Sequence, residues 1–178
     1  VLLGLSILSC HCSRQSEILV VVNEASPVSV AIGQHYIEYR DIPQENLLRL
    51  EVPLDDPRLG GNGHEVIKRE AFDRLIRQPL EDWLTDNEKI SEIEIIVTTK
   101  GLPLRIQGAT VATERLLRDS ETASVDAEIS LLFSKWLGKP GVASTPNPYF
   151  GDPRPFSQFR KEEPDSPLRY MVARLTGY

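Results

Sequence analysis

The sequence has little cysteine: both of its thiols, Cys10 and Cys12, lie near its start. The rest of the chain therefore has no cysteine that could act as a nucleophile. Histidine is also scarce, and His35 and His64 are isolated, so we expect both to be solvated. Structural zinc takes four cysteine or histidine ligands at short spacings, and we expect neither a metal site nor a cofactor. No Ser-His-Asp set stands out either.

The chain also lacks an excess of positive charge and a long apolar run. Twenty Lys and Arg residues against twenty-six Asp and Glu give a net charge of -6. This is the wrong sign for a protein that binds nucleic acid by neutralising phosphates. A membrane-spanning helix needs roughly 20 apolar residues, so a polytopic membrane protein is excluded. The 178 residues, 40% of them hydrophobic, predict one folded globular domain.

The first residues have the pattern of an export signal. Residues 1–8, VLLGLSIL, are almost all apolar but too few to span a bilayer. They are typical of the end of a signal-peptide apolar region, and Ile7-Leu8-Ser9-Cys10 resembles a bacterial lipobox. We expect residues 1–16 to be this signal-peptide or lipobox-like segment, with Cys10 as the lipidation site of an exported, periplasmic or membrane-anchored lipoprotein. The alternative is that the run is a buried first strand.

Four apolar runs alternate with three amphipathic segments in the rest of the chain. Short continuous apolar runs are typical of strands buried in a parallel sheet, and apolar residues at three- and four-residue steps are typical of helices. The predicted strands are residues 17–23, 47–52, 93–99 and 170–175. The predicted helices, which alternate with them along the chain, are residues 27–40, 68–84 and 124–136.

Local signals place the helix ends and faces. Ser26 is a candidate N-cap of the first helix and Pro27 suits its first turn, while Ser124 is placed to cap the third helix. Pro79 should kink the second helix, because proline has no backbone N–H to donate. The apolar positions that recur along the first helix are Val28, Ala31, Ile32, Tyr36 and Tyr39.

This alternation predicts an α/β fold with a doubly wound, mostly parallel sheet. Right-handed crossovers and a 2-1-3-4 strand order place the first helix on one face and the other two on the opposite face. One helix cannot cover a face of four apolar strands, so we expect residues 17–178 to be the amino-terminal part of one domain, incomplete at its C-terminus. Residues 55–63, 110–122 and the Pro-rich 140–167 are expected to be irregular.

Ligands of open α/β sheets bind beyond the carboxyl ends of the strands, where the strand order reverses. Polar and charged residues of this sequence fall at that edge, and we expect them to bind an acidic group or a peptide backbone. The alternative is a salt-bridge network that only holds the loops. The candidate binding residues are Asn23, Ser26, Lys100, Arg105, Asp126, Glu128 and Arg174.

Five ordered motifs carry a resemblance to a known family. They are VVVNEASPVSVAIGQHYIEYRDIPQENLLRL, IIVTTKGLPLRI, ASVDAEISLL, NPYFG and YMVARLTGY. Together they resemble an uncharacterised bacterial family found in genomes that carry the exosortase protein-sorting system. The resemblance covers residues 19–178 and implies a longer chain, but no established activity. A distant, fold-level likeness to gingipain-type and caspase-like peptidases implies a catalytic His and Cys beyond this chain.

Two functions are expected from these observations. The first is an exported envelope protein associated with exosortase-type protein sorting, hydrolase-like or peptidase-like, with its catalytic residues outside this chain. The alternative is a non-catalytic α/β interaction module of the cell envelope. The expected partner is a protein or peptide ligand, with no nucleic acid, and the membrane is contacted only through a lipid at Cys10.

Overall fold

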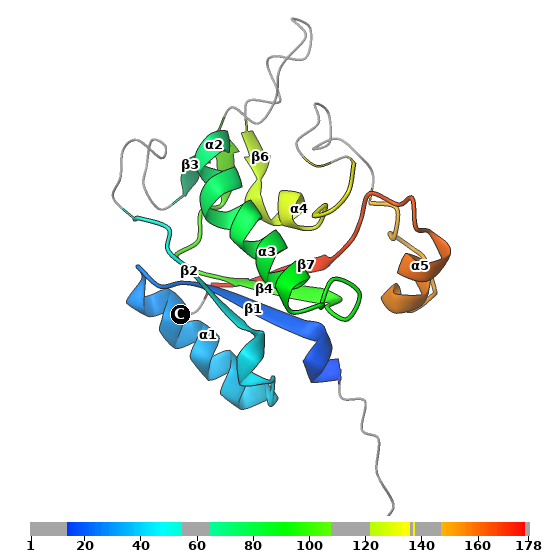
Figure 1. The fold of residues 1–178 in the computed structure, drawn as a ribbon, viewed down its shortest axis with the longest axis horizontal. Helices are drawn as coiled ribbons and strands as arrows, with labels where there is room; N and C mark the ends of the chain where they lie inside the picture. The colour runs from blue at the N-terminus through cyan, green and yellow to red at the C-terminus, as the bar shows by residue number, and fades with distance from the viewer. Residues whose placement is uncertain (1–13, 55–64, 108–121, 136, 138–146, 177–178) are drawn as a thin grey trace, which may run out of the picture.

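The structure is a computed structural model that describes residues 14–54, 65–107, 122–135, 137 and 147–176 (Figure 1). Cys10 and the first thirteen residues of the expected export segment lie outside the described residues. The same holds for the expected loop 55–63 and for all of 110–122 except its last residue. Within the described part of the chain, no helix is long and apolar enough to cross a membrane.

Four parallel strands form the main sheet, in the spatial order β2-β1-β4-β7. This is the predicted order, because these are the four strands that the sequence predicts. Their bounds are β1 (Ile18–Asn23), β2 (Leu47–Leu50), β4 (Ile95–Thr99) and β7 (Met171–Leu175). Short 3-10 turns, η1 (Arg14–Glu17) and η2 (Gln44–Asn46), precede β1 and β2. The structure thus has the α/β fold expected from the apolar runs.

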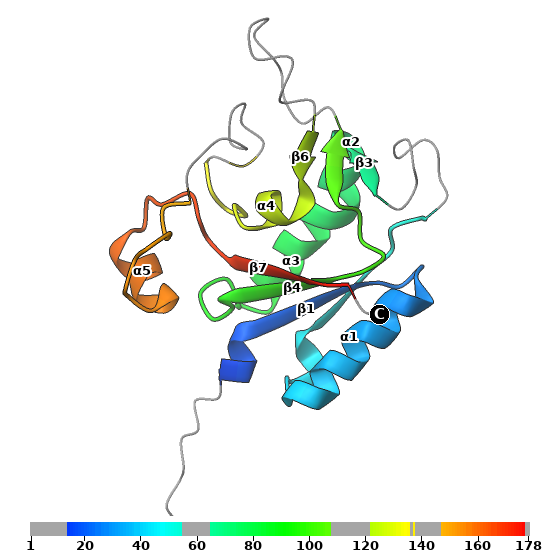
Figure 2. The same cartoon turned by 180° about the vertical axis from the view of Figure 1, so that it is seen from behind.

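Helices cover both faces of the main sheet (Figures 1 and 2). On one face α1 (Pro27–Arg40) packs against Val20 and Val22 of β1. The opposite face, with Leu19 and Val21, is covered by the other helices. These are α2 (Arg69–Phe72), the π turn η3 (Asp73–Arg77), α3 (Gln78–Asp86) and α4 (Val125–Ile129). This is the expected division of the helices between the two faces.

The buried face of α1 differs from the predicted one. Ser29, Gly33 and Ile37 point to the sheet, whereas Val28 is 54% exposed and Tyr39 is 75% exposed. Gly33 explains the difference, because a Cβ at this position would lie 2.2 Å from Cγ1 of Val22. Without a side chain there, the helix approaches the strand closely on its small-residue face. Val28 and Tyr39 are left on the exposed side of α1.

The second and third predicted helices are less regular than expected. In place of the kink expected at Pro79, the structure has the π turn η3. This turn contains Leu75, which lies four residues before Pro79. A proline crowds the carbonyl at that position, and the wider π turn relieves the contact. The third helix is shorter than predicted, because the Ser130 carbonyl oxygen accepts the N–H groups of Arg169 and Tyr170 (2.8 and 3.2 Å). The helix therefore ends at Ile129 instead of continuing to residue 136.

A second sheet of three short strands was not predicted. It contains β3 (Val66–Lys68), β5 (Arg105–Gln107) and β6 (Thr122–Ser124), in the order β3-β5-β6. Strands of three residues are too short to show an alternating pattern in the sequence. β5 follows the loop after β4, so this sheet adjoins the edge of the main sheet at which the strands end.

The Pro-rich segment is only partly irregular, because it contains α5 (Phe156–Glu162). The Arg160 guanidinium donates hydrogen bonds to the carbonyl oxygens of Ile93 (2.6 Å) and Ile90 (2.9 Å) and lies over the ring of Tyr170. α5 is therefore fastened to the chain that leads into β4. The prediction of an irregular excursion over 140–167 is wrong for these residues, and 140–146 lie outside the described residues.

Candidate functional site

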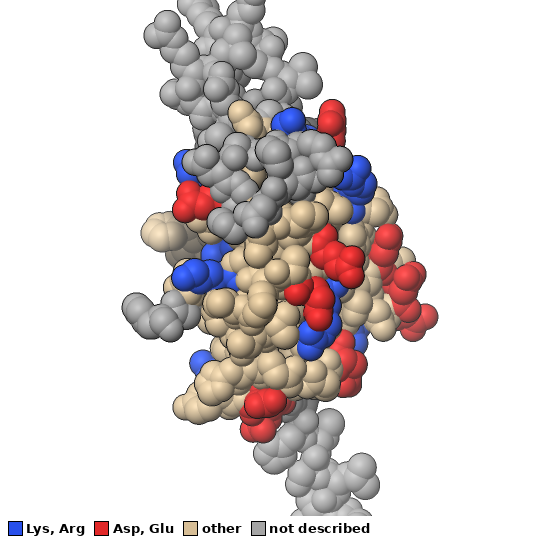
Figure 3. Space-filling view, turned by 90° about the vertical axis from the view of Figure 1, so that its left-hand side faces the viewer, with Lys and Arg blue, Asp and Glu red and all other residues tan. Residues whose placement is uncertain are grey.

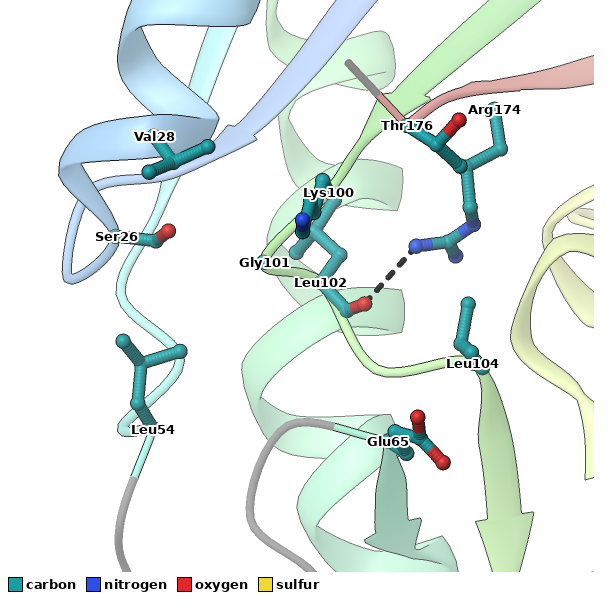
Figure 4. A pocket seen from close by; sticks show the side chains of 10 residues that line it. All are labelled: Ser26, Val28, Leu54, Glu65, Lys100, Gly101, Leu102, Leu104, Arg174 and Thr176. Atoms are coloured by element: carbon teal, nitrogen blue, oxygen red, sulfur yellow. Dashed lines mark hydrogen bonds between the residues drawn. The ribbon is translucent and has the colours of Figure 1, made fainter. Parts of the chain in front are cut away.

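A cavity of about 530 Å³ lies at the edge of the main sheet where its strands end. Figure 4 shows Ser26, Val28 and Leu54 on one side of it, with Lys100 and Gly101 in the middle and Arg174 and Thr176 on the other side. Small-molecule sites usually have volumes of about 300–1,000 Å³, so this cavity is large enough for a ligand. Its lining residues are Ser26, Val28, Leu54, Glu65, Lys100, Gly101, Leu102, Leu104, Arg174 and Thr176.

The cavity lies at the point where the strand order reverses. β1 has β2 on one side and β4 on the other, and α1 follows β1 over one face while the segment that follows β4 and leads to α4 lies over the opposite face. The two connections diverge between β1 and β4 and leave a crevice at the carboxyl ends of these strands. The sequence places the candidate residues at this edge, and the structure shows which of them line the cavity.

Asn23 joins three chain segments below the cavity. Its side-chain amide donates hydrogen bonds to the carbonyl oxygens of Val52 (2.8 Å) and Gly101 (2.9 Å). Its side-chain oxygen accepts the backbone N–H groups of Val52 (3.0 Å) and Ala25 (3.2 Å). Asn23 is fully buried, and these bonds use both ends of its amide. It therefore positions the ends of β1 and β2 and the loop after β4, and does not line the cavity.

Ser29 and Thr99 extend this buried network, and the sequence analysis did not identify them. Their hydroxyl oxygens are 2.6 Å apart, the Ser29 oxygen accepts the N–H of Asn23 (2.7 Å), and the Thr99 hydroxyl donates to the Val21 carbonyl oxygen (3.1 Å). One feature of the sequence could have indicated Ser29: it lies four residues before Gly33, and therefore on the same face of the helix. A buried, fully bonded hydroxyl pair fixes α1 against β4.

Residues 100–104 form the loop that we call the Lys100 loop, and Gly101 sets its path. Gly101 has a φ of 103°, a conformation that favours glycine. A Cβ at this position would lie 2.6 Å from the Ser26 hydroxyl oxygen and 3.0 Å from the Ser29 Cβ. Only glycine therefore allows the loop to pass this close to the start of α1. Ser26 itself caps α1 by accepting the Ser29 N–H (3.3 Å).

Arg174 holds the other side of the Lys100 loop. Its guanidinium pairs with both carboxylate oxygens of Asp126 (2.8 and 2.6 Å) and donates to the carbonyl oxygens of Leu102 (2.9 Å) and Pro103 (3.0 Å). Bidentate pairs of this kind are strong and directional. The structure therefore brings the predicted residues Arg174 and Asp126 together, and their bonds fix the loop.

Lys100 has different surroundings from Arg174. Its side chain is exposed and lines the cavity, and its backbone N–H donates to the Leu175 carbonyl oxygen (2.8 Å). Among the described residues, its ammonium group forms no ion pair and no side-chain hydrogen bond. The Lys100 loop, held by Asn23 and Arg174, thus presents at the cavity a positive charge that has no ion-pair partner among the described residues.

Arg105 and Glu128 lie apart from Lys100. Arg105 pairs with Glu65 across 3.3 Å, and both side chains are more than half exposed. Glu128 is buried and pairs with Arg69 of α2 at 2.8 Å. The expected charged cluster is therefore divided into a surface pair, a buried pair between α2 and α4, and the Arg174–Asp126 pair. Of its cations, Lys100 is the one without a carboxylate partner in the described chain.

The described lining offers charge, hydroxyl groups and apolar walls. Figure 3 views the molecule from the side where the strands end, and the middle of this face is largely uncharged, with acidic side chains along one border. His35 is exposed on α1 and stacks on Tyr39, outside the lining. No three metal-ligating His, Cys, Asp or Glu side chains group together within the described ranges. This arrangement can bind a ligand by its charge and its apolar surface.

Searches with the chain against protein-family models, curated proteins and solved structures found no match. The functional interpretation therefore depends on the cavity and on the sequence motifs.

Proposed function

We propose that this protein binds a peptide or a small organic ligand in the cavity at the carboxyl edge of the main sheet. The observation that carries the proposal is the Lys100 loop, which is fixed from both sides and presents, beside apolar walls, an ammonium group that no carboxylate of the described part of the chain pairs with. A loop whose backbone is already ordered binds a ligand with a smaller entropic cost than a loop that must first become ordered. The position of the cavity at the reversal of strand order supports the same proposal.

The proposed setting is the envelope of a bacterium that carries the exosortase system. The lipobox-like residues 7–10 support export and lipidation at Cys10, and the five motifs support the exosortase association. In this setting the ligand is a segment of an exported protein or a molecule of the envelope. Fractionation with palmitate labelling tests the location, since labelling should disappear in Cys10→Ser, and labelling that persists would contradict a lipid at Cys10.

Ligand binding is tested by amide NMR of the labelled chain with short peptides and aliphatic acids. We expect shifts at Gly101, Leu102 and Thr176, and we expect Leu104→Trp to abolish them by filling the cavity. Tyr39→Trp is the matched control, because Tyr39 is exposed on α1 but does not line the cavity. Shifts that map only to other surfaces, or that persist in Leu104→Trp, would contradict the proposal.

Binding fits both a peptidase-like protein and an interaction module. A peptidase would use a nucleophile from outside these residues, since the described lining contains no thiol or imidazole. Mass spectrometry of a bound peptide distinguishes the two: cleavage by the full-length gene product supports the peptidase, and an intact peptide after prolonged incubation supports the module.

A further inference from the structure

We infer that the ligand of this cavity is a monoanion, a carboxylate attached to a branched aliphatic group, and that Lys100 binds the carboxylate. This inference rests on the proposed binding function and adds the chemical class of the ligand. Two sources supply this chemistry: the carboxyl-terminal Leu, Val or Ile of a peptide, and a free branched-chain acid.

The apolar part of the ligand is indicated by Val28 and Leu104. They are two of the six large apolar side chains that are exposed among the described residues, at 54% and 40%. Both line the cavity, Val28 from α1 and Leu104 from the Lys100 loop, and half-buried Leu54 and buried Leu102 extend the apolar lining between them. A branched aliphatic group placed here would remove both exposed side chains from water, which is favourable in proportion to the apolar area buried.

The charge of the ligand is indicated by the pairing of the charged groups at the cavity. Arg174 is neutralised by Asp126 at 2.6 Å, and Glu65 is neutralised by Arg105 at 3.3 Å. Within the described ranges, the ammonium group of Lys100 is left as a single positive charge without an ion-pair partner. One compact positive charge suits a single carboxylate, whereas a phosphate or other dianion would leave a negative charge uncompensated and close to Glu65.

The position of Lys100 explains how both parts of one ligand are recognised. It precedes Gly101 and Leu102 in the loop that carries Leu104, so Lys100 and the Leu104 side of the apolar lining belong to one fixed segment. Asn23 holds Gly101 on one side and Arg174 holds Leu102 on the other. The backbone positions of Lys100 and Leu104 are therefore set before the ligand binds, and the Lys100 side chain extends from this fixed base, which favours a ligand with a short distance between its carboxylate and its aliphatic group.

The test is a calorimetric and NMR titration of the full chain with four probes. They are 4-methylpentanoate, its primary amide, N-acetyl-Ala-Leu with a free carboxylate, and the same dipeptide as its amide. We expect at least one acid to bind about fivefold more tightly than its amide, the effect of one partly exposed ion pair. Lys100→Met should remove this preference and Lys100→Arg should retain it. Lys68→Met, at an exposed lysine outside the lining, should leave it unchanged.

The outcomes separate the inference from the proposed function. Preference for the dipeptide acid alone supports a peptide terminus as the source, and preference for 4-methylpentanoate supports a free acid. Equal affinity for acid and amide overturns the carboxylate inference, although the cavity would still be a binding site. A preference that persists in Lys100→Met overturns the role of Lys100. If none of the probes shifts the amides of the cavity, both the inference and the proposed function fail for this ligand class.

Discussion

Lys100 and Arg174 lie at the same edge of the main sheet, yet their side chains have different partners. Arg174 is largely buried and bound to Asp126 and to two carbonyl oxygens of the Lys100 loop. Lys100 is exposed and unpaired among the described residues. A charged residue at a strand end can therefore be structural or available to a ligand, and only the arrangement of its partners distinguishes the two.

Replacement of Arg174 tests its structural role. We expect Arg174→Met to lower the free energy of unfolding by about 3 kcal/mol, because Asp126 is left as a partly buried charge without its partner. Arg105→Met is the matched control, since its pair with Glu65 is exposed, and it should cost less than about 1 kcal/mol. Urea unfolding curves of the two variants and of the unmodified chain measure both losses. Equal losses for the two variants would show that Arg174 does not hold the loop.

Tyr170 gives the protein a dependence on alkaline pH. Burial raises the pKa of its phenol from 10.0 to about 12. Because the folded pKa is the higher one, stability is complete below pH 10 and is lost as the pH rises towards 12, by about 3 kcal/mol for two pKa units. Urea unfolding between pH 8 and about 11 measures the first part of this loss, roughly half of it, which Tyr170→Phe should reduce. Difference absorbance between the folded chain and Tyr170→Phe reports the ionisation of this phenol. Ionisation near pH 10 would contradict the raised pKa.

At the scale of elements, α1 shows how far the sequence determines a structure. Its bounds were predictable, because Ser26 and Pro27 are local signals that act within one turn. Its buried face was not, since the apolar positions suggested Val28 and Tyr39, whereas the close approach at Gly33 selects the face with Ser29. Periodicity reports which faces are apolar, but contact with a particular strand decides which face is buried.

Close packing at Gly33 leads to a prediction for α1. Gly33→Ala should lower stability by about 1–3 kcal/mol, although alanine favours helices, because its Cβ would overlap Cγ1 of Val22. Val22→Ala removes that methyl group, so the double variant should be more stable than the sum of the two single losses implies. Thermal unfolding of the unmodified chain, the two single variants and the double variant measures this coupling. A stabilising Gly33→Ala would show that α1 lies farther from β1.

The candidate site was predictable only in its position. The strand order placed Asn23, Ser26, Lys100 and Arg174 at one edge, and the structure has them there. Their roles depend on partners distant in the sequence, such as Gly101 for Asn23, and a pattern along the chain cannot reveal these. The end of α4 at Ile129 and the three-residue strands β3, β5 and β6 were missed for the same reason: tertiary hydrogen bonds determine them.

At the scale of the whole molecule, the two faces of the main sheet are covered unequally. On the face of α1, Met171 of β7 is 41% exposed and Ala173 is exposed, and β7 is the last strand of this sheet in the described chain. We predicted that additional protein covers this surface, and this stays a prediction. We expect the chain to enhance the fluorescence of an apolar-surface dye, and Met171→Gln to lower it. No enhancement would argue against an uncovered apolar face.

The central claim is that a ligand binds in the cavity between α1 and the Lys100 loop. The most direct measurement is a crystal structure of the chain with N-acetyl-Ala-Leu. We expect the leucine side chain to lie between Val28 and Leu104, with its carboxylate about 3 Å from the Lys100 ammonium group. A ligand found elsewhere, or bound here with its carboxylate turned away from Lys100, would contradict it.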